Sequence, residues 1–118
     1  MTFKIHVFEP SGILNATSGN ELRRQITDIL NNGFNMLLID MSKVSFIDSS
    51  GLGALVGAMQ SVRNAKGELF ICSLNEQVKM LFELTKIDRV LNILSNREEF
   101  DSKVLELENR QKLFKHPG

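Results

Sequence analysis

The stretch VSFIDSSGLGALVGAM, residues 44–59, decides how this chain is interpreted. An apolar run stops at Asp48, Ser49 and Ser50, and an apolar pattern rich in small residues follows. Such a change, from an apolar run to short polar residues and then to helical periodicity, is typical of a strand that ends where a helix begins. We therefore expect this acid and these two hydroxyls at the mouth of a helix.

Apolar patterning on both sides of this stretch predicts alternating strands and helices. Residues 3–8 alternate in polarity, as a half-buried strand does, whereas 34–41 form a continuous apolar run that suits a strand buried on both faces. Leu22, Ile26 and Leu30 recur on one face of a helix. The expected strands are 3–8, 13–15, 34–41, 68–73 and 90–94, and the expected helices are 17–33, 49–67, 75–85 and 95 onward.

Polar residues with short side chains mark where the helices are expected to begin. Such side chains accept hydrogen bonds from the first N–H groups of a helix, which have no partner within it. Thr17, Ser18 or Asn20 is expected to cap the first helix, and Asn75 the third. Ser95 opens SNRE, a capping-box pattern, at the last helix.

The element order β-β-α-β-α-β-α-β-α places the chain in the α/β class. Strands that are separated by helices pair in parallel, with the helices as crossovers. Turn residues at 9–12, EPSG, predict instead that the first two strands pair antiparallel. We expect a mixed, mostly parallel β-sheet with an N-terminal antiparallel hairpin and about four helices. Residues 1–118 are expected to form a single domain, with its core at about 3–105 and an extended C-terminal helix or tail at 106–118.

The composition argues against several function classes. Lys and Arg together number 14, as do Asp and Glu, so the chain has no net positive charge to attract a nucleic acid. No apolar run approaches the roughly 20 residues of a membrane span. The single cysteine, Cys72, lies in an apolar run and is expected to be a reduced core residue of a cytoplasmic protein. His6, expected on the solvent side of the first strand, is far from His116 in sequence, so we expect neither a metal site nor a cofactor.

Four interpretations of the two serines follow from their residue types. Capping alone needs one polar residue and contributes about 1 kcal/mol. A nucleophilic serine needs a base, which neither histidine is placed to supply, so we do not expect an enzyme. A nucleotide-binding loop needs G-x-x-x-x-G-K-[ST], and residues 44–62 contain no Lys or Arg. A serine that receives a phosphate from a separate kinase needs only exposure near the unpaired N–H groups of a helix start, and we favour this interpretation.

Small residues interleave with the expected core stripe of the second helix. They are Gly51, Gly53, Ala54, Gly57 and Ala58. Small side chains would leave the surface of the first turns of this helix flat, which suits the close approach of a partner protein. Tight packing of the helix on its own sheet would favour the same residues, and the sequence does not separate the two explanations.

The chain as a whole resembles the STAS domain, a family named for sulfate transporters and anti-sigma factor antagonists. The segment VSFIDSSGLGALVG, 44–57, closely matches the phosphorylation loop and following helix of bacterial anti-anti-sigma proteins. SGILNATSGNELRRQI, 11–26, is similar to the second strand and first helix of the family. GELFICSLNEQVKMLFELTKIDRVLNI, 67–93, is similar to its fourth strand, third helix and last strand. The resemblance covers about residues 3–105.

This resemblance implies a partner-switching cycle that regulates transcription. The unphosphorylated protein binds an anti-sigma factor, often a serine kinase of the GHKL ATPase type, and a sigma factor is freed. The kinase then phosphorylates the serine after the aspartate, which is Ser49 here, and the phosphorylated form dissociates until a serine phosphatase restores it. The implied partner-binding residues around this serine are Asp48, Ser50, Gly51, Leu52 and Gly53.

A departure from the family pattern falls at Asn15. Many relatives carry an acid there, in a G-x-L-D pattern, whereas this chain has GILNA. Asparagine keeps a short hydrogen-bonding side chain without the charge, so Asn15 is expected to bind the partner without the electrostatic role of an acid. The resemblance also permits an alternative function, as a non-catalytic STAS subunit of a stressosome-type or lipid-transport-type complex. The intact D-S-S-G favours the switch.

Overall fold

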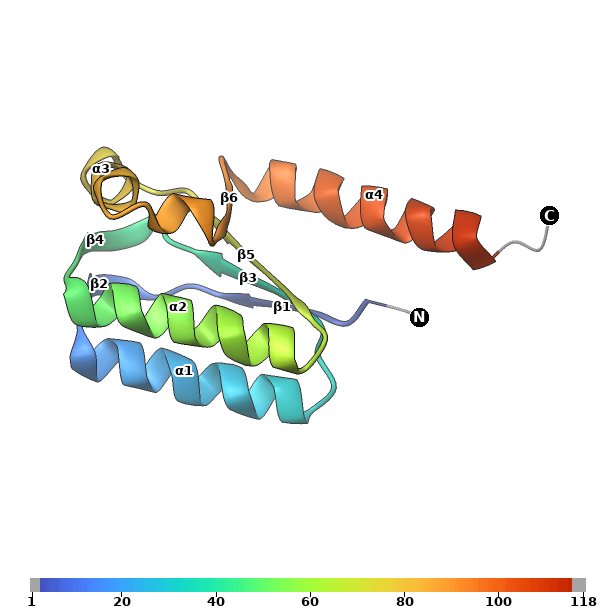
Figure 1. The fold of residues 1–118 in the computed structure, drawn as a ribbon, viewed down its shortest axis with the longest axis horizontal. Coiled ribbons are helices and arrows are strands. Elements are labelled where there is room, and N and C mark those ends of the chain that lie inside the picture. Colours follow the sequence, from blue (N-terminus) through green and yellow to red (C-terminus); the bar gives the residue numbers. More distant parts are fainter. Residues whose placement is uncertain (1–2, 116–118) are drawn as a thin grey trace.

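The structure is a computed structural model that describes residues 3–115. Within this range six strands alternate with four α-helices and one short 3-10 helix (Figure 1). The strands are β1 (Ile5–Phe8), β2 (Ser11–Leu14), β3 (Met36–Asp40), β4 (Lys43–Ile47), β5 (Glu68–Cys72) and β6 (Asn92–Leu94). The helices are α1 (Ala16–Asn31), α2 (Ser49–Asn64), α3 (Glu76–Leu84), the 3-10 helix η1 (Ile87–Arg89) and α4 (Arg97–Lys115). The α/β class and the four helices are confirmed.

A four-stranded parallel sheet forms the centre of the molecule. Its strand order is β1-β3-β5-β6. Leu37 and Ile39 of β3 belong to the large apolar cluster shared with α1, α2 and α3, whereas Met36 and Leu38 belong to a smaller cluster shared with α4. α1 and α2 accordingly lie on one side of the sheet and α4 on the other (Figure 1). The prediction that this strand is buried on both faces is confirmed.

The predicted antiparallel hairpin of the first two strands is wrong. β1 pairs in parallel with β3, and β2 pairs in parallel with β4 in a second, two-stranded sheet. Pro10, between β1 and β2, has no N–H for a hairpin ladder and disfavours a helical turn at the residue before it. The chain therefore passes from one sheet into the other between β1 and β2.

β4 is a strand that is missing from the expected set, because the expected strand 34–41 ends before it. A tight turn divides β3 from β4, because the Ser42 N–H donates to the Asp40 carboxylate at 2.9 Å and the Val44 N–H to the Met41 carbonyl at 3.0 Å. An Asp that hydrogen-bonds the backbone two residues ahead is a turn former. This turn redirects the chain so that β4 ends at the DSSG stretch.

The N-caps of α3 and α4 differ in how well the sequence predicted them. Asn75 caps α3 as predicted, because its side chain accepts the Val78 N–H at 2.8 Å. At α4 the predicted cap Ser95 is wrong by one residue, since Asn96 accepts the Glu99 N–H at 2.9 Å. The predicted C-terminal extension is helical through Lys115. Residues 116–118, which include His116, lie outside the described residues.

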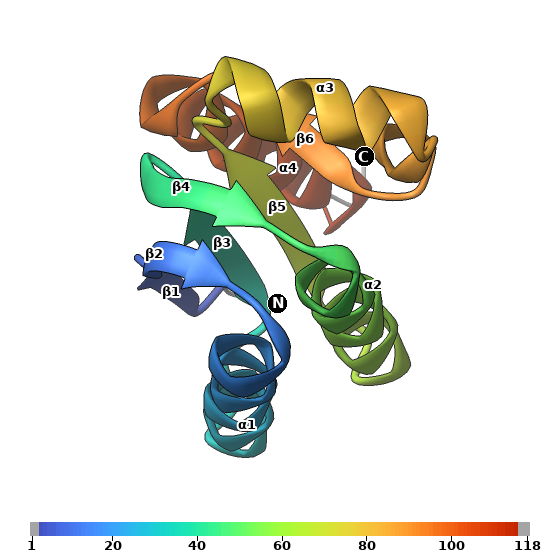
Figure 2. The same ribbon diagram turned by 90° about the vertical axis from the view of Figure 1, so that its left-hand side faces the viewer.

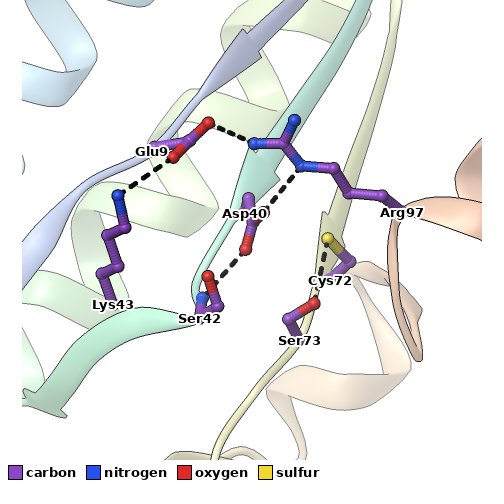
Figure 3. Close-up of polar contacts among 7 residues, drawn as sticks. All are labelled: Glu9, Asp40, Ser42, Lys43, Cys72, Ser73 and Arg97. Atoms are coloured by element: carbon purple, nitrogen blue, oxygen red, sulfur yellow. Dashed lines mark hydrogen bonds and ion pairs between the residues drawn. The ribbon is translucent and has the colours of Figure 1, made fainter.

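A charged cluster joins the start of α4 to the carboxyl ends of β1 and β3 (Figure 3). The Arg97 Nε donates to the Asp40 carboxylate at 2.8 Å, and the same guanidinium pairs with Glu9, which also meets Lys43 at 3.5 Å. Asp40 is only 7% exposed. Burial opposes its ionisation, but the Ser42 N–H and Arg97 outweigh burial, so the pKa of Asp40 is lowered.

Replacing Asp40 by asparagine should reduce stability at neutral pH and much less in acid. In the unfolded chain an Asp titrates near pH 3.9, and the folded pKa lies below the ordinary value. The ionised form therefore stabilises the fold above the unfolded pKa, and this contribution is lost as the pH falls through the folded pKa. We expect Asp40→Asn to cost about 1–2 kcal/mol at pH 7 by urea unfolding.

The difference between wild type and Asp40→Asn should shrink as the pH is lowered from 7 towards 3. Glu21→Gln is the matched control, because Glu21 is an exposed carboxylate paired with Arg24 on the same helix. Its stability should stay close to that of wild type throughout. A difference for Asp40→Asn that is constant with pH would show that the charge of Asp40 is not what stabilises the cluster.

Candidate functional site

The mouth of α2 has the local geometry that the DSSG stretch predicts. Asp48 is in an extended conformation, and its carboxylate accepts the Gly51 N–H at 2.9 Å, so Asp48 is the N-cap. Ser49 is the first residue of the helix, and both Ser49 and Ser50 are exposed. Backbone N–H groups in the first turn and the helix dipole favour negative charge at this place. The Ser49 hydroxyl can therefore be reached by another protein, and the local field tolerates a phosphate.

Gly51 and Gly53 have different surroundings, although they are two residues apart. A Cβ at Gly51 would lie 2.2 Å from the Leu14 carbonyl oxygen and 2.8 Å from a side-chain carbon of Ile47. A Cβ at Gly53 would meet nothing within 4 Å. Gly51 is therefore needed for the close contact of α2 with β2 and β4, whereas Gly53 is open to the surroundings.

Ala54 and Gly57 lie in the contact between α1 and α2. A Cβ at Gly19 would lie 2.8 Å from the Cβ of Ala54. Further along, a Cβ at Gly57 would lie 2.8 Å from the guanidinium carbon of Arg23, so this α1 side chain lies against α2. Tight packing therefore accounts for Gly51 and Ala54, whereas it does not account for Gly53, which is open.

Asn15 lies beside the DSSG stretch because of the pairing of β2 with β4. Leu14 pairs with Ile47, so the residues that follow these two strands start α1 and α2 side by side. The Asp48 N–H donates to the Leu14 carbonyl at 3.2 Å and ties the two helix starts together. Figure 2 shows α1 and α2 both beginning at the ends of this strand pair.

Asn15 is itself the N-cap of α1, which corrects the predicted caps Thr17, Ser18 and Asn20. Its side chain accepts the Ser18 N–H at 3.1 Å, and the Ser18 hydroxyl accepts the Asn15 N–H at 2.9 Å, which completes a capping box. Sequence analysis missed this cap because the apolar periodicity of α1 starts only at Leu22. Asparagine fills this position without adding charge beside Asp48.

Leu52 and Gly51 are buried, whereas the other expected partner-binding residues reach the surface. Leu52 is packed in the large apolar cluster. Ser50 and Gly53 are exposed, and Asp48 and Asn15 are half-buried. The exposed part of the predicted site is therefore a small polar patch of Ser49, Ser50 and Gly53, flanked by the two capping side chains.

Exposed apolar residues lie next to this patch, and the sequence analysis did not identify them. Phe46 is 51% exposed, three residues before Ser49, and Ile13 is its neighbour across the β2–β4 pair. A groove of about 360 Å³ runs from β4 to α3, and its lining residues are Phe46, Ile47, Gln77, Val78, Met80, Leu81 and Leu84. Strict alternation from Val44 would place Phe46 inward, so the local sequence pattern does not predict its exposure. The pairing of β4 with β2 shifts register between Gly12 and Ile13, which leaves Ser45 as an extra residue and turns Phe46 outward while Ile47 points inward.

The described part of the chain has neither a cluster of metal-binding side chains nor a membrane-spanning helix. Residues 3–115 contain no group of three His, Cys, Asp or Glu side chains that could hold a metal ion. No described helix has the combination of length and apolarity that crossing a bilayer requires. His6, expected on the solvent side, is half-buried and packs against the rings of Phe8 and Phe34.

Comparison with known proteins identifies the family of the chain. The STAS domain family profile matches residues 3–100. A TM1081 homologue from Thermotoga neapolitana, named as a candidate anti-sigma factor antagonist, is 31% identical over 79% of this chain and 83% of its own length. The anti-sigma-B factor antagonist of Listeria monocytogenes is 40% identical over 49% of this chain and 51% of its own length.

Solved structures of the cell fate determinant SpoIIAA of Bacillus share the fold. Its unphosphorylated form, described as an anti-sigma factor antagonist, superposes with a TM-score of 0.66 at 20% identity over 88% of this chain and 92% of that one. Its phosphorylated form gives a TM-score of 0.65 at 20% identity, over 86% and 92% of the two chains. With the family profile and the curated relatives, these findings show that the chain belongs to the STAS domain family, among the anti-sigma factor antagonists.

Proposed function

We propose that this protein is a switch that binds an anti-sigma factor when Ser49 is unmodified and releases it when Ser49 is phosphorylated. The observation that carries the proposal is the exposed Ser49 hydroxyl at the first residue of α2, beside the open position Gly53. A GHKL-type serine kinase, which is the anti-sigma factor itself, supplies the phosphate, and a serine phosphatase removes it. The cycle runs in the cytoplasm and needs no catalytic group of this chain.

The partner surface in this proposal combines the polar patch with the neighbouring apolar residues. The phosphorylation site is surrounded by Ser50, Gly53 and the two capping residues Asp48 and Asn15. The buried residues Gly51 and Leu52 pack the start of α2 against the rest of the domain. Phe46 extends the surface towards the groove along α3. Apolar side chains around a small polar centre are a common arrangement in protein interfaces.

Phosphorylation acts on the interface more than on the fold. A phosphate on Ser49 adds about −1.5 to −2 charges at pH 7, and in the free protein it remains hydrated. In the complex the same group would be enclosed next to Asp48 and against a kinase that holds nucleotide phosphates. Enclosing a charge without a paired cation costs several kcal/mol, so the modified protein dissociates.

The phosphorylation site can be mapped once the partner is captured. The unmodified protein is used to isolate its partner from cell extract, and the isolated complex is incubated with ATP. We expect one phosphate per chain, located by peptide mapping at Ser49, and none on Ser49→Ala. Ser45→Ala is the matched control, because Ser45 is an exposed serine of β4 whose hydroxyl hydrogen-bonds the Gly12 carbonyl. Phosphate on Ser50, Ser45 or Ser42 would contradict the assignment.

A further inference from the structure

α4 covers a separate apolar cluster on the second face of the central sheet. The strands contribute Met36, Leu38, Phe70 and Cys72 to this cluster, and α4 contributes Phe100 and Val104. Cys72 is 0% exposed. The other helices pack into the larger cluster on the opposite face, and Figure 1 shows α4 apart from α1 and α2. Loss of α4 alone would therefore expose the cluster around Cys72 and leave the larger one intact.

Among the α4 side chains that the structure describes, those of residues 97–112, few attach the helix to the sheet. Within this range Phe100 and Val104 are the buried apolar residues, and Leu107 is partly buried on the same face. At its first turn Arg97 reaches Asp40 at 2.8 Å and also pairs with Glu9 (Figure 3). The segment before it, Ser95 and Asn96, is exposed.

α4 also has ion pairs of its own, which do not involve the sheet. Glu106 meets Arg110 at 2.6 Å and Lys103 at 3.6 Å, at the spacings that stabilise an isolated helix. These pairs favour the helical form of the segment whether or not it packs on the sheet. Local opening of a segment with few buried contacts costs less free energy than unfolding of the whole domain.

We infer that α4 is a displaceable lid, held shut by the pairing of Arg97 with Asp40, and that its opening exposes the apolar sheet face around Cys72. This inference does not depend on the phosphorylation cycle. It assigns the Glu9–Asp40–Arg97 cluster a conformational role at the sheet face opposite to α2.

The reactivity of Cys72 towards the thiol reagent DTNB tests the lid directly. Cys72 is the single cysteine of the chain, so the reaction reports one position. In the folded wild type we expect slow labelling whose rate rises with urea less steeply than global unfolding does, because opening of one helix exposes less surface. Arg97→Gln should accelerate labelling by about tenfold or more, and Arg97→Lys, which keeps a charge, should fall in between.

The matched control is Arg110→Gln, which removes an ion pair within α4 and should label within about twofold of wild type. Global urea unfolding of each variant is measured in parallel. Labelling of Arg97→Gln at the wild-type rate would overturn the lid. So would labelling with the urea dependence of global unfolding, because Cys72 would then react only when the whole domain unfolds.

Discussion

Ser49→Asp should melt within a few degrees of the wild-type protein and yet bind the anti-sigma factor more than about a hundredfold more weakly. Ser49 is exposed at the positive end of α2, where a negative charge gains about 0.3–1 kcal/mol. Asp48 repels the new charge by a comparable amount, so the two effects on folding roughly cancel. In the complex the carboxylate must be enclosed at an interface, and a cost of about 3 kcal/mol corresponds to the expected loss of affinity.

Two further variants distinguish a specific loss of partner binding from a non-specific effect of substitution. Ser49→Ala removes the acceptor hydroxyl without adding charge, so it should bind as wild type does and stay bound when ATP is added. Ser102→Asp places the same charge on an exposed serine of α4 and should change neither melting nor binding. The measurements are thermal unfolding and titration calorimetry with the captured partner.

The outcomes distinguish the possible roles of Ser49. If Ser49→Asp unfolds the domain, the serine is structural, and its exposure in the unbound protein is misleading. If the variant folds and binds with wild-type affinity, the phosphorylation switch is contradicted. A carboxylate carries less charge than a phosphate, so the phosphorylated protein itself, prepared with the kinase, should show at least the same loss of binding.

Gly51→Ala and Gly53→Ala should have opposite effects on stability, although the two glycines belong to the same helix turn. A methyl at Gly51 would be forced to within 2.2 Å of the Leu14 carbonyl oxygen, which belongs to the backbone and cannot turn away. Overpacking of this kind costs about 1–3 kcal/mol or more. We expect Gly51→Ala to lose about 2–3 kcal/mol and to melt roughly 10 °C or more below wild type.

Gly53→Ala is the matched control, because its methyl would meet nothing within 4 Å. Alanine is a better helix former than glycine by up to about 1 kcal/mol, so this variant should be as stable as wild type or slightly more stable. Any defect of Gly53→Ala should therefore appear in partner binding rather than in thermal unfolding. Equal destabilisation by both variants would show that the contact between Gly51 and Leu14 does not control the fold here.

The local sequence determined most of the elements and the chemistry of the site. Periodicity sets the strands and helices of an α/β fold, because apolar residues must reach a buried face at a spacing of 2 or 3.6 residues. The DSSG stretch likewise determines a helix start with an exposed serine, since Asp48 can cap the Gly51 N–H using only neighbouring residues. The cap at Asn75 is correct for the same reason.

The tertiary structure decided which elements meet. β2 pairs with β4 instead of β1 because strand pairing is a long-range choice, made by the apolar residues that the two strands share with the core. This pairing brings Asn15 next to Asp48, sets the Leu14 carbonyl against Gly51 and turns Phe46 outward beside Ser49. Asp40 and Arg97 likewise meet across 57 residues of chain. Local sequence fixes how each segment folds, but a contact between distant segments depends on the packing of the whole domain, which no single segment encodes.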